Sequence, residues 1–140
     1  MKRVYRAECT ISAPPEAVFD VLADLDAYSA WNPFTVRVQS SLQPGAPVHM
    51  RVVMWGGWLV LPQREQVREV ERPHRIVWGM RMPLGLVRAE RVQTLQAVGE
   101  GTRYLTEDTI EGPLLPLVHL LFGASVQRGF EGVAAALPGR

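Results

Sequence analysis

The stretch I-S-A-P-P-E-A-V-F-D-V-L, residues 11–22, sets the start of the fold because it turns a strand into a helix within a few residues. Pro14 and Pro15 fall in the first turn of the expected helix, where proline's missing amide hydrogen costs nothing, and Ser12 or Ala13 lies near the cap position. Beyond them, apolar residues recur at helical spacing: Val18, Phe19, Leu22 and Leu25. The chain therefore opens as a strand followed at once by an amphipathic helix.

Turn signals divide the rest of the chain into strands and a final helix. Each signal separates two stretches rich in Val, Ile, Leu, Trp or Thr: Pro44-Gly45, Gly56-Gly57, Arg72-Pro73-His74, Pro83-Leu84-Gly85 and Gly99-Glu100-Gly101. They predict six antiparallel strands between residues 34 and 111, and residues 5–11 alternate well enough to add one strand before them. Residues 24–31 continue the first helix as a second short one. After Gly112-Pro113, the chain to Leu137 is expected to form one long helix.

These elements predict an α+β fold built as a single domain over residues 1–140. A seven-stranded antiparallel sheet must bury one face, and a long C-terminal helix covers that face economically when the sheet curves around it. Two short helices follow the first strand. Such an arrangement often leaves a gap between the sheet and the helix.

Length and charge narrow the classes of function. The 140 residues are the size of one ordinary domain, and the single cysteine, Cys9, excludes a disulfide framework. Lys and Arg number 15 against 14 Asp and Glu, evenly spread, so nucleic acid is not an expected partner. The N-terminus lacks the apolar core of a signal peptide, and the longest apolar run, residues 114–126, is shorter than the roughly 20 residues that span a bilayer. We therefore expect a cytoplasmic protein without a transmembrane segment.

Metal and phosphate chemistry is also not expected. The three histidines lie in a strand, a turn and a helix without metal-ligand spacing: His49, His74 and His119. The glycines at 99 and 101 precede a strand rather than a helix, so they do not form a phosphate-binding loop. The sequence therefore predicts neither a metal nor a cofactor.

The last predicted hairpin carries the most informative polar side chains. If Glu100-Gly101 is a two-residue loop, Gln93 lies opposite Asp108 and Arg91 opposite Ile110. One face then holds mostly charges and faces solvent, whereas the other holds four polar candidates in apolar surroundings: Arg91, Gln93, Thr106 and Asp108. Arg91 lies diagonally across from Asp108. Three interpretations stay open: the group orients a ligand, Asp108 acts as a general base with Arg91 stabilising an enolate, or the two form a self-satisfied ion pair.

The neighbouring strands predict an apolar wall. A Gly56-Gly57 loop sets Met54 opposite Leu59 and Val48 opposite Glu65. The inward side chains of these strands are ligand-contact candidates: Met50, Val52, Met54, Leu61, Trp78 and Met80. Methionine suits an adaptable pocket, although an ordinary core would use the same residues. Glu65 joins the candidates unless a bulge at Pro62 turns it outward.

Two further groups of apolar residues are expected at the surface of the protein. Trp55 and Trp58 face away from the gap, which favours a cross-strand pair or a subunit contact. The first part of the C-terminal helix, residues 114–122, is apolar nearly all round and should be covered on more than one side. One side meets the cavity, where Leu121 and Ser125 are ligand-contact candidates, and the other meets a second copy in a homodimer, a membrane surface or the N-terminal helices. Three glycines indicate close packing or a bend: Gly123, Gly129 and Gly132.

The opening stretch also carries a family resemblance. Together with residues 24–28 and 31–34, residues 11–22 resemble the START-like, or SRPBCC, superfamily, and more narrowly its bacterial polyketide cyclase/dehydrase branch. Residues 71–78, residues 101–103 and the Gly-Pro pair before the long apolar helix fit the same pattern, so the resemblance covers essentially the whole chain. It implies the helix-grip fold, in which the C-terminal helix closes a cavity for a hydrophobic small molecule.

The resemblance leaves the activity open, because the superfamily includes lipid carriers, hormone receptors, aromatase/cyclases and co-chaperone domains. The first expectation is a protein that binds a small hydrophobic ligand, such as a lipid, a polyketide or an aromatic metabolite. The alternative is a polyketide cyclase or dehydratase that acts on an aromatic or carbonyl substrate through Arg91 and Asp108. A third is a co-chaperone-like module that contacts protein through Trp55 and Trp58 or through residues 114–122.

Overall fold

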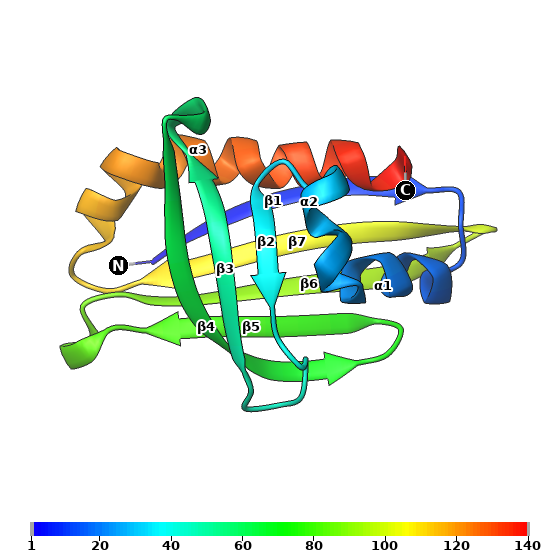
Figure 1. Cartoon of the computed structure of the whole chain (residues 1–140), viewed down its shortest axis with the longest axis horizontal. Helices are drawn as coiled ribbons and strands as arrows, with labels where there is room; N and C mark the ends of the chain where they lie inside the picture. The colour runs from blue at the N-terminus through cyan, green and yellow to red at the C-terminus, as the bar shows by residue number, and fades with distance from the viewer. Residues whose placement is uncertain (1, 140) are drawn as a thin grey trace.

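One curled antiparallel sheet forms the body of the protein, of which the computed structural model describes residues 2–139 (Figure 1). The strands follow the spatial order β1-β7-β6-β5-β4-β3-β2, so β2 to β7 form a meander and β1 pairs with β7 at its edge. Their bounds are β1 Lys2–Ile11, β2 Thr35–Gln39, β3 Pro47–Met54, β4 Leu59–Glu71, β5 Arg75–Arg81, β6 Arg88–Val98 and β7 Gly101–Glu111. The first strand begins earlier than the predicted residue 5.

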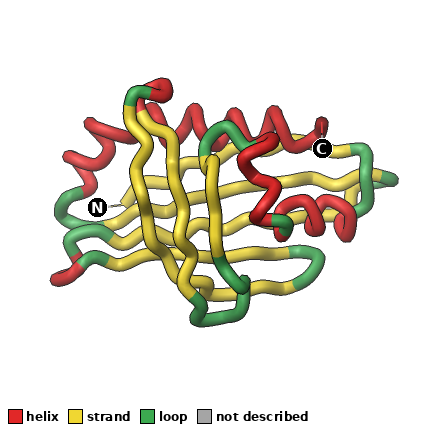
Figure 2. The backbone as a smooth tube through the Cα atoms, in the orientation of Figure 1, coloured by secondary structure: helices red, strands yellow, loops and turns green. Residues whose placement is uncertain are grey.

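The helices lie along the sheet and at one of its ends (Figures 1 and 2). They are α1 (Pro15–Ala23), α2 (Tyr28–Trp31) and the long α3 (Leu115–Ala136), with short 3-10 turns at η1 (Leu25–Ala27), η2 (Trp55–Gly57), η3 (Pro83–Gly85) and η4 (Leu137–Gly139). α3 lies across the curled sheet, and α1 and α2 sit away from the end where α3 begins. This is the predicted α+β helix-grip architecture. None of the helices within residues 2–139 combines the length and the apolar character needed to cross a membrane.

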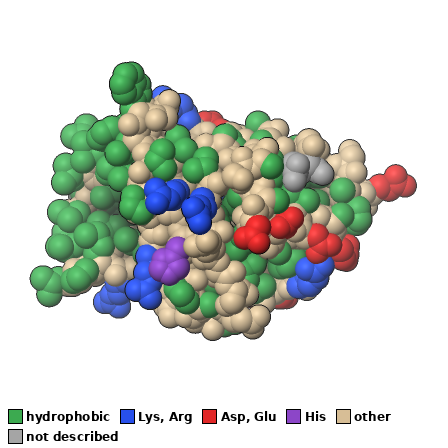
Figure 3. All heavy atoms as spheres, in the orientation of Figure 1, with side chains coloured by type: hydrophobic (Ala, Val, Ile, Leu, Met, Phe, Trp, Pro, Cys, Tyr) green, Lys and Arg blue, Asp and Glu red, His purple; other side chains and the backbone are tan. Residues whose placement is uncertain are grey.

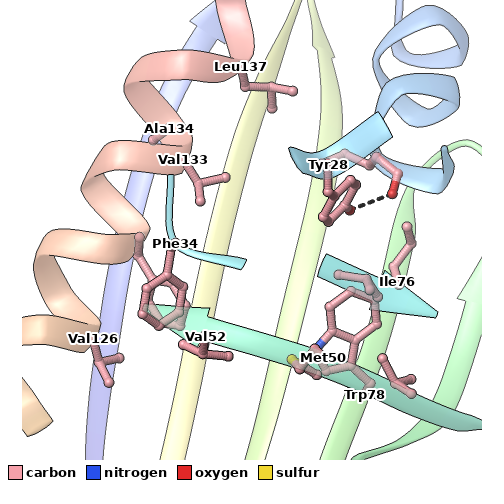
Figure 4. Close-up of a cluster of buried hydrophobic side chains, with 14 of the residues drawn as sticks. Tyr28, Phe34, Met50, Val52, Ile76, Trp78, Val126, Val133, Ala134 and Leu137 are labelled. Carbon is pink, nitrogen blue, oxygen red and sulfur yellow. Dashed lines mark hydrogen bonds between the residues drawn. The ribbon is translucent and has the colours of Figure 1, made fainter. Parts of the chain in front are cut away.

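The local sequence explains the short helices. Proline stands at the cap and at the first position of α1, and the predicted apolar face is buried at Val18, Phe19 and Leu22. Tyr28 at the start of α2 is buried, and its hydroxyl donates a hydrogen bond of 2.5 Å to the Leu22 carbonyl oxygen (Figure 4). This bond ties the two helices together.

The hairpin registers confirm one prediction and correct another. In the β3–β4 hairpin, Met54 pairs with Leu59 and Val48 with Glu65, as predicted, and Pro62 pairs regularly with Arg51 instead of forming a bulge. The irregularity in β4 lies between Val67 and Glu69.

The β6–β7 register predicted above was wrong by two residues. Val98 pairs with Gly101, so the loop is Gly99-Glu100, with Gly99 at a φ of 58°. Arg91 therefore lies directly opposite Asp108, and Gln93 lies opposite Thr106. A shift of two residues keeps the facing of every side chain, so the predicted inward face is unchanged.

The core lies between α3 and the sheet (Figure 4). Val126, Phe130 and Val133 form the buried face of α3, and the ring of Phe34 meets that of Phe130 edge to face, with centroids 5.4 Å apart. Gly129 allows this contact, because a Cβ there would stand 2.0 Å from Cδ1 of Phe34. The glycine thus marks the close packing that the sequence indicated as one of two alternatives.

Candidate functional site

A cavity of about 210 Å³ lies between the sheet and α3. Its walls come from β3 to β7, from α3 and from the start of β2. Five residues of the predicted apolar wall line it: Met50, Val52, Leu61, Trp78 and Met80. Three predicted polar residues line it as well: Glu65, Arg91 and Asp108. These residues therefore come together as the sequence indicated.

The remaining candidates lie outside the lining. Met54 is buried elsewhere in the core, and Leu121 is 43% exposed. Gln93 accepts a hydrogen bond of 2.6 Å from the Tyr104 hydroxyl. Thr106 accepts one of 3.0 Å from Nε of Arg91, and Ser125 accepts one of 2.9 Å from the backbone N–H of Trp55. The three polar side chains among them, Gln93, Thr106 and Ser125, thus form hydrogen bonds with residues around the cavity and do not line it themselves.

Sequence reasoning missed several lining residues. α3 contributes a stripe at four-residue spacing: Val118, Phe122, Val126 and Phe130. That spacing marks one face of a helix and was visible in the sequence. Phe34 and Thr35 also line the cavity, at the point where α2 leads into β2. No local pattern predicted their position.

Three buried polar atoms of the lining have no hydrogen-bond partner among the described residues: Oγ1 of Thr35, Nη2 of Arg91 and Oδ1 of Asp108. Arg91 is held by its bond to Thr106 and by the Phe130 ring, whose centroid lies 4.5 Å from the guanidinium carbon. Within the described chain, Arg91 and Asp108 form neither a hydrogen bond nor an ion pair with each other. The self-satisfied pair left open above is therefore not the arrangement observed.

Burial changes the protonation of the two carboxyl groups in the cavity. Removal from water raises the pKa of Glu65 to about 8, and the negative charge of Asp108 adds to this effect. Burial also raises the pKa of Asp108 to about 6, although the positive charge of Arg91 opposes the rise. At neutral pH, Glu65 is therefore mainly protonated and Asp108 mainly ionised.

Comparison with known proteins identifies the family of the chain. Residues 2–138 match the family described as polyketide cyclase / dehydrase and lipid transport. The chain belongs to this family. Its membership and its cavity support a ligand-binding or cyclase function in general. A search of the curated proteins finds no match.

Solved structures share the fold of this polyketide cyclase/dehydrase family member. The Zhui aromatase/cyclase from Streptomyces sp. R1128 is 17% identical with a TM-score of 0.79, over 99% of this chain and 93% of that one. A protein from Thermus thermophilus is 23% identical with a TM-score of 0.74, over 98% and 95%. A START superfamily protein from Mycobacterium smegmatis is 19% identical with a TM-score of 0.72, over 98% and 95%. At these identities the likeness shows the fold alone.

The cavity of this family member has half-buried lining residues on the first half of α3 as well as on the neighbouring strands. Its partly exposed lining residues include Leu61, Met82, Val118 and Phe122. At this part of the lining, the ring of Trp55 stacks on Phe122 with centroids 5.7 Å apart, and its indole N–H donates a hydrogen bond of 2.7 Å to the Leu121 carbonyl oxygen. Trp55 therefore holds the β3–β4 hairpin against α3, and the cross-strand pair of Trp55 with Trp58, one of the two roles predicted for them, does not form in this structure.

Proposed function

We propose that the protein binds a small apolar molecule whose inner end carries a neutral hydrogen-bonding group, such as a phenol or an alcohol. The observation that supports this is the set of three unpartnered polar atoms in a mainly apolar cavity. A buried polar atom without a partner costs on the order of 1–3 kcal/mol, which a ligand group that both donates and accepts would recover. A hydroxyl group can donate to Asp108 and accept from Arg91.

The size of the cavity supports a compact ligand. A volume of about 210 Å³ exceeds the roughly 150 Å³ of an apolar cavity that binds benzene, and it falls below the roughly 300 Å³ at which drug-sized pockets begin. One or two aromatic rings match this space. Among the ligand classes expected from the sequence, an aromatic metabolite therefore fits better than a long lipid or an extended polyketide chain. We also propose that the protein binds this ligand in the cytoplasm.

The charges of the buried side chains support a neutral group at the end of the ligand that lies against Arg91 and Asp108. At neutral pH, Arg91 carries a positive charge, Asp108 is mainly ionised and Glu65 is mainly protonated, because burial raises the pKa of Glu65 to about 8. The three groups together are close to neutral. A ligand carboxylate or phosphate would add an uncompensated negative charge beside Asp108.

Three matched probes test the proposal. 2-Naphthol, naphthalene and 2-naphthoate have the same ring system and differ in the polar group. We expect 2-naphthol to bind about tenfold more tightly than naphthalene, since one to two net hydrogen bonds are worth about 1.4 kcal/mol, and more tightly than 2-naphthoate. Equal binding of 2-naphthol and naphthalene would overturn the assigned polarity. No binding of any probe, and no bound molecule in native mass spectrometry of protein from its own host, would overturn the function.

A second candidate is a polyketide cyclase or dehydratase, and the raised pKa of Asp108 favours it. A carboxyl with a pKa of about 6 is close to the operating pH of a general base. Asp108 would take a proton from a carbon next to a carbonyl, and the enolate oxygen would accept a hydrogen bond from Nη2 of Arg91. Turnover of a poly-β-keto thioester that is lost in Asp108→Asn, with the fold intact, would support this function. Unchanged turnover would remove Asp108 from it.

A further inference from the structure

Three large apolar side chains project into solvent from segments next to residues that line the cavity. Trp58 in the β3–β4 hairpin is 92% exposed, Leu84 in the β5–β6 loop is 95% exposed, and Leu120 on α3 is 80% exposed. They come from three different elements. Each projects as a separate tip, and none packs against the core.

Hydrogen bonds hold these three elements at the same end of the molecule. The backbone N–H of Leu114 donates to the Leu86 carbonyl oxygen over 3.1 Å and joins the start of α3 to the β5–β6 loop. The indole of Trp55 joins the β3–β4 hairpin to α3 through the Leu121 carbonyl oxygen. We call residues 55–58, 82–87 and 112–122 the apolar end, and Figure 3 shows hydrophobic side chains gathered there. N-terminal helices do not cover it, since α1 and α2 lie elsewhere.

The charges around the apolar end are arranged unevenly. The apolar end itself contains no Asp, Glu, Lys or Arg. At the adjoining ends of β1 and β5, the basic side chains Lys2, Arg3 and Arg81 are exposed, while Arg88 is paired with Glu111. Acidic residues occupy the segment of α1 and η1, away from this end: Glu16, Asp20, Asp24 and Asp26.

We propose that the apolar end docks on a membrane surface that contains anionic lipids. The tips at Trp58, Leu84 and Leu120 insert between the headgroups, and the basic side chains at the adjoining strand ends contact the anionic groups. Separate tips leave gaps that flexible lipid chains fill, whereas a second rigid protein surface would need to match all three. Because the segments that carry these tips also supply lining residues of the cavity, such as Met82, Val118 and Phe122, an apolar molecule could pass between membrane and cavity without crossing water. That route rests on the proposed function, but the docking does not.

Vesicle flotation of the full chain tests the docking. The probes are vesicles of phosphatidylcholine alone and of phosphatidylcholine with phosphatidylglycerol. We expect the protein to float with the second kind and added salt to weaken the binding. The variant Trp58→Ser/Leu84→Ser/Leu120→Ser should lose at least tenfold in affinity, because it removes three apolar insertions. Val98→Ser removes a half-exposed apolar residue away from the apolar end and should bind like the wild type.

Two controls separate the outcomes. Arg3→Gln/Arg81→Gln should lower binding to vesicles with phosphatidylglycerol and leave binding to phosphatidylcholine unchanged. The triple variant should keep its affinity for 2-naphthol, because none of the three residues lines the cavity. Failure to float with either vesicle, or equal flotation of wild type and triple variant, would overturn the docking whatever the probes show. A dimer that the triple variant makes monomeric, without vesicle binding, would replace the membrane by a second copy of the chain.

Discussion

Arg91 on β6 and Asp108 on β7 are direct cross-strand partners, yet their side chains do not bind each other. Arg91 is held instead by the Thr106 hydroxyl and by the face of Phe130. Its Nη2 and the Oδ1 of Asp108 are thereby left for a third group in the cavity. The two charges still act on each other, because Arg91 lowers the pKa of Asp108 against the larger effect of burial.

Replacement of Arg91 should destabilise the protein strongly. Arg91→Met removes the positive charge that lowers the pKa of Asp108, so this buried carboxyl takes up a proton near neutral pH. Because the bond to Thr106 and the contact with the Phe130 ring are lost as well, we expect a loss on the order of 1–3 kcal/mol in the free energy of unfolding. The double variant Arg91→Met/Asp108→Asn should recover part of this loss. Urea unfolding of the four proteins in the cycle measures the coupling.

Arg88→Met is the matched control for that cycle. Arg88 lies on the same strand and pairs with Glu111, but its side chain is 52% exposed, so its loss should cost less than about 1 kcal/mol. If the Arg91 and Asp108 substitutions were simply additive, the electrostatic coupling inferred across β6 and β7 would be absent.

Glu65 should make stability fall as the pH rises. The pKa of Glu65 is about 8 in the folded protein against an ordinary 4.5, so the folded state holds a proton between these values that the unfolded state releases. The free energy of unfolding therefore decreases across this window. Glu65→Gln carries no such proton, so we expect it to match the wild type near pH 4 and to exceed it by on the order of a few kcal/mol at pH 9.

Thermal unfolding at the two pH values measures this difference. Glu69→Gln serves as the control, since Glu69 lies on the same strand with an exposed side chain paired to Arg75. It should change stability little at either pH. A Glu65→Gln variant that is no more stable than the wild type at pH 9 would contradict the assigned protonation.

Much of the fold was predictable from local sequence. Turn residues separate the strands of a meander, and in a meander consecutive strands are neighbours, so the order of β2 to β7 follows from their succession. The alternation of apolar and polar residues along each strand then predicted which face of the sheet points inward. The register at the last hairpin was missed because Glu100 stands between two glycines, and a two-residue loop can use either Gly99-Glu100 or Glu100-Gly101.

The site was only partly predictable, because contacts between distant elements complete it. Arg91, Asp108 and Glu65 were found because polar residues interrupt an inward apolar face. Thr35 reaches the cavity because the chain after α2 packs against α3 through Phe34 and Phe130. Trp55 contacts Phe122 because the tip of the β3–β4 hairpin packs against the same helix. Neither contact is marked by a pattern in the residues that flank it along the chain.

Gly129 should be far less replaceable than Gly132, although both lie within α3. Alanine favours a helix over glycine by about 1 kcal/mol. At Gly129, a Cβ would stand 2.0 Å from the Phe34 ring, so we expect Gly129→Ala to destabilise by about 1–3 kcal/mol in spite of that gain. At Gly132, the nearest atom is Cγ of Pro33 at 3.0 Å, and Gly132→Ala should be close to neutral. Chemical denaturation that ranks the two variants equally would contradict the close packing.

Trp55 should control both stability and access to the cavity, whereas Trp58 should control neither. Trp55→Phe keeps a ring that can stack on Phe122 but loses the bond to the Leu121 carbonyl oxygen, so we expect a loss of about 1 kcal/mol. Trp55→Ala also removes the ring, and we expect a larger loss in the free energy of unfolding. We also expect faster entry and release of 2-naphthol, because the hairpin then no longer packs against Phe122, which lines the cavity. Trp58→Ala changes a side chain that is 92% exposed and should leave both quantities unchanged. Stopped-flow fluorescence and urea unfolding measure the two effects, and equal 2-naphthol rates in the wild type and Trp55→Ala would show that this hairpin does not gate the cavity.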